Sequence, residues 1–297
     1  MAAPEIHLHP IRHCLEPSCR DCPRGAALSL TVYFLGLGDV GFPPRAPTYG
    51  AEELDFPRSL ARRLGRGPHE CCRKELGSVR YDHAARIPEN AAVVAQWIDR
   101  RIDEAVRSQH WLTKVNLHLV GFSSGGLLAL DTARLVTSGR RLRDAGIVWC
   151  GREQNREVEV EIDLVTMAAP FDLGVVFSGT LTTGRPWTFV SSVGASEYEA
   201  PPPGRLCSFT ALVSSSRHGD KSLGADRDPS QDGRLRAFLE GFDPTRRRIV
   251  QLRDEWQPQD PDDEDDPERV PHAAVPRRVL EDFPWALVPG CRCVETF

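Results

Sequence analysis

The stretch of residues 115–136, VNLHLVGFSSGGLLALDTARLV, decides the fold of this chain. Its beginning is short and mostly apolar, which predicts a strand. Its second half spaces leucine, alanine and valine so that they cover a wide face of a helix. The turn between them reads GFSSG, a G-x-S-x-G pattern that runs from Gly121 to Gly125 with Ser123 at its centre. A strand, a tight turn and a helix form the context in which this pattern presents a nucleophilic serine.

The two glycines of the pattern have a steric reason. The chain reverses so sharply that a side chain two residues before or after Ser123 would collide with its neighbours. We expect Ser123 to have a strained backbone conformation, with its hydroxyl exposed above the sheet. The helix that follows would point backbone N–H groups at the site and favour a developing negative charge there. The alternative is a glycine-rich turn of another doubly wound fold, although neither phosphate-binding glycine pattern is present.

Length and composition indicate a globular α/β protein of one large domain or two small ones. The chain has 297 residues, of which 40% are hydrophobic and 27% charged. No apolar run approaches the length of a membrane span, and the N-terminus lacks a signal-peptide pattern, so we expect a cytoplasmic protein. The net charge is −5, but residues 260–268 alone hold seven carboxylates, and the remainder carries +2 without a concentrated basic stripe. Nucleic acid is therefore not an expected partner.

The cysteines favour reduced thiols over disulfides or a metal centre. The sequence contains nine cysteines, an odd number, and no secretion signal accompanies them. Cys14, Cys19 and Cys22 form a cluster close to several histidines, but no second C-x-x-C pair completes a metal site. We therefore expect neither a metal ion nor an organic cofactor.

Strand patterns alternate with helix patterns along the rest of the chain. Strands are predicted at residues 28–35, 78–82, 158–167, 208–214 and 249–252, and helices at 54–64, 88–106, 235–242 and 275–283. This alternation predicts a mostly parallel sheet that is covered by helices on both faces.

The domain boundaries follow from composition. Residues 1–26 are predicted to be an irregular leader, and residues 27–297 a single domain. That domain contains candidate lid insertions near residues 42–77 and 173–205, which are rich in proline or in glycine and serine, and an acidic loop at 257–270.

A glycine-rich loop after the first predicted strand is a candidate oxyanion hole. The sequence runs from that strand into Gly36, Leu37 and Gly38. Glycine lets the backbone approach a substrate oxygen closely, so the N–H of Leu37 is a candidate donor, joined by the N–H of Ser124. The alternative is an ordinary turn between a strand and a helix.

A serine needs a base within hydrogen-bond reach, and the base needs an orienting group. Asp220 follows the strand predicted at 208–214, and His272 lies in VPHAAVP, residues 270–276, before the last helix. Asp172 also follows a strand and is the alternative acid. His218 is less suitable as the base because it is too close to Asp220 to occupy a separate loop.

In its order of elements over about residues 28–285, and in the motif GFSSG, the chain resembles the α/β-hydrolase superfamily, most closely its lipase and esterase branch. It departs from the family at Leu35-Gly36, where a His-Gly pair is common. The resemblance implies the chain order nucleophile, acid and histidine. Ser123 would be the nucleophile, His272 the general base and then the acid, and Asp220 the orienting carboxylate. Some lipases carry the acid after an earlier strand, as Asp172 would be.

These observations together predict a serine hydrolase that cleaves a carboxylic ester or thioester through an acyl-enzyme on Ser123. A small-molecule acyl substrate is the expected partner, and the sequence does not indicate a protein partner. Two alternatives remain open: a non-catalytic binding protein with the same fold, and an acyltransferase that uses the same residues.

Overall fold

The computed structural model describes residues 4–11, 27–36, 56–65, 73–81, 87–109, 112–138, 140–143, 146–150, 156–167, 176–180, 186–190, 208–213, 247–251 and 275–287.

A twisted sheet forms the centre of the protein. Among the described residues it has nine strands, and its main path runs in the order β1-β3-β2-β4-β7-β10-β11. The contacts from β3 through β2, β4, β7 and β10 to β11 are all parallel. The strands are β1 Glu5–His9, β2 Ala27–Phe34, β3 Arg73–Arg80, β4 Lys114–Phe122, β5 Arg141–Arg143, β6 Gly146–Cys150, β7 Glu157–Met167, β10 Ser208–Val213 and β11 Arg247–Gln251. A separate hairpin pairs β8 Val176–Thr180 with β9 Pro186–Val190.

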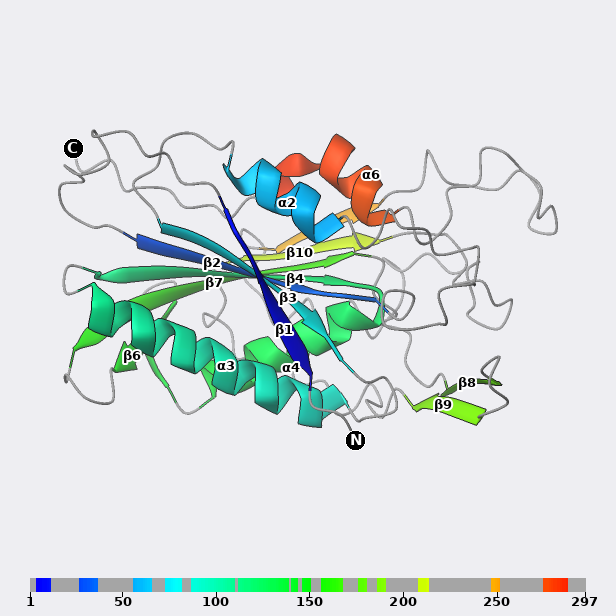
Figure 1. Cartoon of the computed structure of the whole chain (residues 1–297), viewed down its shortest axis with the longest axis horizontal. Coiled ribbons are helices and arrows are strands. Elements are labelled where there is room, and N and C mark those ends of the chain that lie inside the picture. Colours follow the sequence, from blue (N-terminus) through cyan, green and yellow to red (C-terminus); the bar gives the residue numbers. More distant parts are fainter. Residues whose placement is uncertain are drawn as a thin grey trace.

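Helices cover both faces of the sheet, as Figure 1 shows. The helices α3 (Ile87–Ser108) and α4 (Ser124–Thr137) lie on one face, and α2 (Phe56–Gly65) and α6 (Val275–Asp282) on the other. A short 3₁₀ turn, η6 (Pro284–Ala286), follows α6. The predicted fold class, a mostly parallel sheet between two helical layers, is confirmed.

Successive side chains of a strand point to opposite faces of the sheet, so the strands contribute to two buried cores, one on each face. In β2, Leu28, Leu30, Val32 and Phe34 pack into the core that contains α3 and α4. Tyr33 and Leu35 belong to the opposite core, which contains residues of α2 and α6. Because most strands of the parallel array are buried on both faces, their sequences read as nearly continuous apolar runs.

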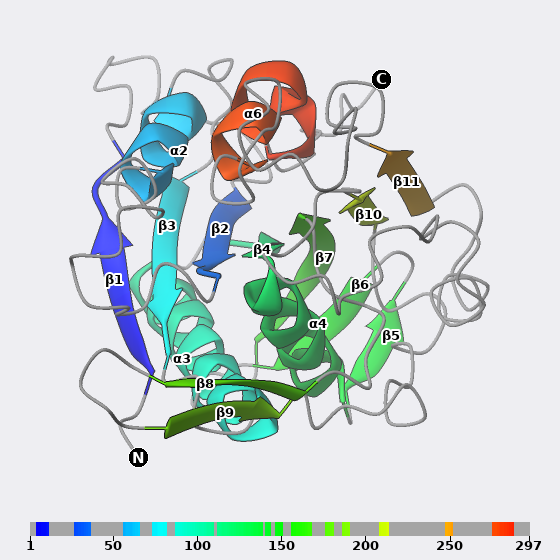
Figure 2. The same ribbon diagram turned by 90° about the vertical axis from the view of Figure 1, so that its right-hand side faces the viewer.

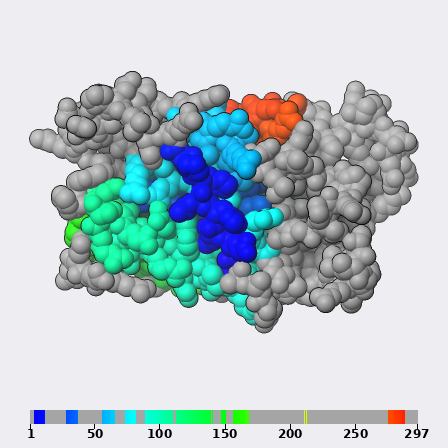
Figure 3. Space-filling view, viewed as in Figure 1, coloured from blue at the N-terminus to red at the C-terminus, as the bar shows by residue number. Residues whose placement is uncertain are grey.

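Residues 5–9 differ from the irregular leader expected for residues 1–26. They form β1, which pairs antiparallel with β3 from Glu5 opposite Arg80 to His9 opposite Leu76. Figure 3 shows β1 on the surface between α2 and α3. The sequence EIHLH alternates polar and apolar residues but is only five residues long, and as an edge strand it buries little of its surface, with only Ile6 and His9 partly buried.

Two other segments also belong to the body of the domain. Part of the candidate lid at 42–77 forms α2, whose Phe56, Leu60 and Leu64 are buried, and the start of β3. Residues 146–150 form β6, a strand that was not among those predicted from the sequence. This strand pairs antiparallel with the first half of β7, while β10 pairs parallel with the second half.

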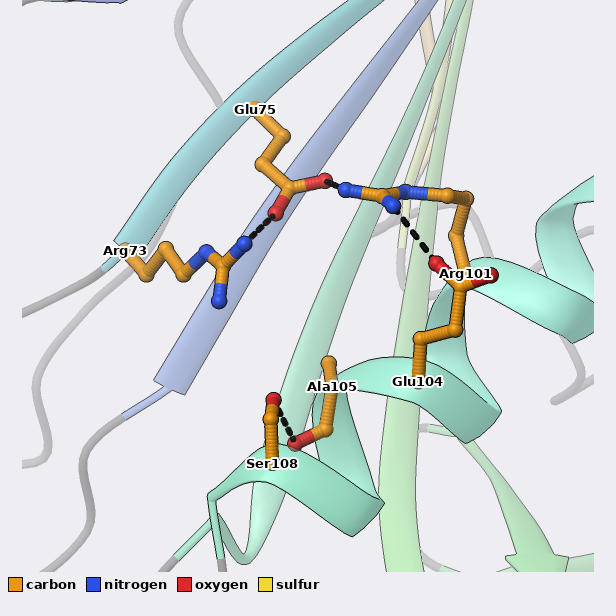
Figure 4. Close-up of polar contacts among 6 residues, drawn as sticks. All are labelled: Arg73, Glu75, Arg101, Glu104, Ala105 and Ser108. Atoms are coloured by element: carbon orange, nitrogen blue, oxygen red, sulfur yellow. Dashed lines mark hydrogen bonds and ion pairs between the residues drawn. The ribbon is translucent and has the colours of Figure 1, made fainter.

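A group of ion pairs connects α3 with β3, as Figure 4 shows. Glu75 of β3 accepts from Arg73 at 2.8 Å and from Arg101 of α3 at 2.6 Å. Arg101 also contacts Glu104 at 2.6 Å. The Glu75 side chain is only 11% exposed, so removal of Arg101 would leave a mostly buried carboxylate with half of its partners.

Candidate active site

The turn after β4 lies at the middle of the sheet. β4 lies between β2 and β7, and every residue after its first is buried. The strand ends at Phe122 and α4 begins at Ser124, so Ser123 is the single residue between them. Figure 2 shows β4 and α4 close to each other near the centre of the molecule. In open parallel sheets, ligands bind at the carboxyl ends of the strands, and Ser123 lies at such an end.

Ser123 has a strained backbone. Its φ is 51° and its ψ is −128°, and it is the one non-glycine residue with a positive φ among those that the structure describes. A conformation of this kind costs on the order of 1–3 kcal/mol and persists only where its surroundings enforce it. Here the Ser123 N–H donates to the carbonyl oxygen of Met167 at 2.9 Å, and its carbonyl accepts from the Gly126 N–H at 2.9 Å.

The Ser123 side chain does not cap α4, although serine is a preferred residue at this position of a helix. The residue is only 5% exposed, in contrast to the exposed hydroxyl expected from the sequence. Its hydroxyl is thus not used to satisfy the N–H groups of the first helical turn.

The two glycines of the motif are required by close contacts between backbones. A Cβ at Gly121 would lie 2.3 Å from the carbonyl oxygen of Gly125. A Cβ at Gly125 would lie 2.4 Å from the carbonyl oxygen of Phe34 and 2.5 Å from that of Leu35. These neighbours are backbone atoms that cannot rotate away. The predicted collision and the predicted strain at Ser123 are both confirmed.

The chain that leaves β2 passes directly beside Ser123. The N–H of Leu35 donates to the carbonyl of Val79 at 3.2 Å, which keeps this segment at the end of the sheet. A Cβ at Gly36 would lie 2.7 Å from the Phe122 ring and 3.1 Å from the Cβ of Ser123. Leu37, the candidate oxyanion donor, is the next residue and lies outside the described residues.

The neighbouring serines have different surroundings. The Oγ of Ser124 is 2.8 Å from the phenol oxygen of Tyr81, and either atom can be the donor. Both residues are 2% exposed. The hydroxyl of Ser124 is therefore engaged with a buried partner. Sequence reasoning missed Tyr81, because a tyrosine after a strand gives no local signal that it contacts a residue 43 positions away.

Asp172, Asp220 and His272 all lie outside the described residues. The structure does place the strands that precede the two aspartates. β7 ends at Met167 and β10 at Val213, and both are parallel to β4 within one sheet. The segments that leave these strands therefore start at the same edge of the sheet as Ser123.

His118 is a buried histidine in the middle of β4. Burial lowers the pKa of its imidazole to about 4, although a hydrogen bond with the backbone of Ala286 acts in the opposite direction. It precedes Ser123 by five positions, or about 16 Å at the rise of a strand. At that distance it is not a base for Ser123, and we interpret it as a neutral histidine of the core.

Neither a cluster of metal ligands nor a membrane-spanning helix is present in the described part of the chain. Within it, no three His, Cys, Asp or Glu side chains are grouped so that they could hold a metal ion. The cysteine cluster at Cys14, Cys19 and Cys22 lies outside these residues. None of the described helices is both long and apolar enough to cross a bilayer.

Comparison by sequence gives no relative: neither a protein-family model nor a curated protein matches this chain.

Comparison by structure finds α/β serine hydrolases, esterases and lipases. The carboxylesterase Cest-2923 from Lactobacillus plantarum WCFS1 is 14% identical, with 96% of this chain and 94% of that chain covered and a TM-score of 0.45. The monoacylglycerol lipase of Paleococcus ferrophilus is 10% identical, with 89% and 96% covered and a TM-score of 0.43. XC6422 from Xanthomonas campestris, an α/β serine hydrolase without a lid, is 14% identical, with 84% and 78% covered and a TM-score of 0.36.

Proposed function

We propose that this protein is a serine hydrolase that cleaves a carboxylic ester or thioester, with Ser123 as the nucleophile. The observation that carries the proposal is the backbone of Ser123, with φ of 51° and ψ of −128°, at the turn between the central strand and its helix. Strained conformations cluster at functional sites, because a residue that fits without strain would otherwise replace the strained one during evolution. A glycine would fit this conformation freely, yet the sequence has a serine.

The first half of the reaction would form an acyl-enzyme. The Ser123 hydroxyl attacks the acyl carbon while His272 takes its proton, and a tetrahedral oxyanion forms. The oxyanion collapses, the bond to the alcohol or thiol breaks, and His272 returns the proton to that leaving group. Asp220, or Asp172 in its place, would orient the histidine and stabilise its charged form.

The second half would release the acid. His272 removes a proton from water as the water attacks the acyl carbon of the ester on Ser123. The second tetrahedral intermediate collapses, the bond to the Ser123 oxygen breaks, and this oxygen regains the proton from His272. The products are a carboxylic acid and the free enzyme.

Two backbone N–H groups are suited to stabilise the oxyanion. Ser124 is the first residue of α4, so its N–H is among those that have no acceptor within the helix. The close approach of Gly36 to Ser123 supports Leu37 as the second donor, since Leu37 is the next residue along the chain. Loss of one such donor in a serine hydrolase costs roughly 10²–10³ in kcat.

The proposal is tested by labelling with a fluorophosphonate probe and by turnover of a short p-nitrophenyl ester. Ser123→Ala should abolish both, and its urea unfolding should resemble that of the wild type. Ser124→Ala is the matched comparison, because it removes the adjacent hydroxyl but keeps the N–H, and it should lower labelling and turnover by no more than about ten-fold, well short of the loss of a whole donor. Full turnover by Ser123→Ala would refute the mechanism.

Product analysis separates hydrolysis from acyl transfer, which would use the same residues. Turnover in the presence of a competing alcohol or amine should yield mainly the free acid if water is the acceptor. A wild-type protein that neither reacts with the probe nor cleaves esters and thioesters would instead indicate a binding protein.

A further inference from the structure

Tyr81 extends from the end of one strand to the first residue of the helix after Ser123. It directly follows β3, which ends at Arg80, and its ring lies in the core shared with α3 and α4. Its phenol oxygen is 2.8 Å from the Oγ of Ser124. Because β2 separates β3 from β4 in the sheet, the contact connects the end of β3 with the helix that follows a strand two places away.

The contact restrains Ser124 from outside its own helix. A buried hydroxyl without a partner costs free energy, and this contact gives the hydroxyl groups of Tyr81 and Ser124 a partner in each other. The tyrosine side chain has only two main torsions, and packing of its ring fixes where its oxygen lies. The Oγ of Ser124 is thereby held at one point, and the backbone to which it is attached is restrained with it.

We propose that Tyr81 is a positioning residue for catalysis. It fixes Ser124, whose backbone N–H lies beside Ser123 and is suited to receive the oxyanion. The inference deepens the proposed hydrolase function and rests on it. Oxyanion stabilisation depends on donors that are already in place when charge develops. An N–H group that is held less firmly therefore stabilises the transition state less, whereas it changes substrate binding little.

Tyr81→Phe and Ser124→Ala remove the same hydrogen bond from its two ends. We expect each to lower kcat about five- to ten-fold, less than the roughly 10²–10³-fold effect of losing a donor, because the N–H is still present. KM should stay within about two-fold, since the interaction acts in the transition state. The rate of fluorophosphonate labelling should fall by a similar factor, because the phosphonyl oxygen of the probe would occupy the position of the oxyanion.

The double variant tests whether the two residues act through one another. If they do, Tyr81→Phe combined with Ser124→Ala should lower kcat no further than either change alone. The pH dependence of kcat/KM should keep its midpoint, because the catalytic base is untouched. Tyr33→Phe is the matched control, since Tyr33 is an equally buried tyrosine of β2 in the opposite core, and its kcat should be unchanged.

Unchanged kcat in Tyr81→Phe, or equal losses in Tyr81→Phe and Tyr33→Phe, would overturn the inference and leave Tyr81 a structural residue. If Tyr81→Phe does not fold, Ser124→Ala tests the inference in its place, and a wild-type kcat in Ser124→Ala would overturn the positioning role of Tyr81. Ser123→Ala in the same assays separates the two proposals. If it is inactive while Tyr81→Phe matches the wild type, only the positioning role fails, whereas full turnover by Ser123→Ala refutes the hydrolase itself.

Discussion

Replacement of Ser123 by glycine should stabilise the protein while abolishing its activity. The backbone of Ser123, at φ 51° and ψ −128°, costs on the order of 1–3 kcal/mol for a residue with a Cβ, and glycine avoids this cost. Glycine also makes the unfolded chain more flexible, which subtracts about 0.4–1 kcal/mol. Ser123→Gly should therefore be more stable than Ser123→Ala by roughly 0.5–2 kcal/mol, after both contributions.

The measurement is urea unfolding of the wild type and the two variants, with thermal unfolding alongside. For domains of 150–250 residues, about 1 kcal/mol corresponds to a change in Tm of about 2–4 °C, so the difference is measurable. Ser29 of β2 provides the control, because it is buried and has no positive φ. There the order should reverse, with the glycine variant less stable than the alanine variant. A Ser123→Gly protein no more stable than Ser123→Ala would refute the reasoning from strain.

Two further predictions concern the acid of the site and the pH dependence of folding. Asp220→Asn should lower kcat by roughly 10⁴, as in serine proteases, and Asp172→Asn far less; the reverse result would assign the acid to the loop after β7. Burial lowers the pKa of His118 from 6.5 to about 4, so between these pH values the unfolded chain binds more protons and stability falls as pH decreases. The loss should approach about 3 kcal/mol near pH 4, at 1.36 kcal/mol per pH unit. The free energy of unfolding, measured in urea between pH 4 and 7.5, should change less with pH in His118→Asn than in the wild type or in the control His7→Gln. The same pH dependence in all three proteins would contradict this role of His118.

The parts of the fold that follow from local patterns could be predicted from the sequence. The long strands β2 and β7 and the helices α3 and α6 have their apolar residues in runs or at helical spacing, and each appears near its predicted position. The strands β1 and β6 were missed for a different reason. Both lie outside the parallel array: β1 pairs antiparallel with β3, and β6 pairs antiparallel with β5 and β7. Both are only five residues long, so their formation depends strongly on these partners.

The same division applies to the candidate site. The geometry of Ser123 could be predicted, because the two glycines that permit it are within two residues of it in the chain. The choice between Asp172 and Asp220 could not. The strands before them, β7 and β10, are neighbours in the sheet and end at the same edge, so strand order alone does not distinguish the two aspartates. The contact of Tyr81 with Ser124 depends on how two separate strands pack, which no spacing in the sequence encodes.

The contacts that hold Ser123 also determine when, during folding, it can become reactive. Its N–H is bound by Met167, 44 residues further along the chain, and the helix after it packs on the backbone of Phe34, far earlier in the sequence. A nascent chain that has been synthesised only through α4 lacks β7 and so has nothing to enforce the strained turn. In such a chain the residue would relax to an ordinary conformation, with an ordinary serine hydroxyl. If Ser123 is the nucleophile, as proposed, its reactive form would arise only after the central strands have assembled, and a partly folded molecule should be chemically inert towards acyl groups.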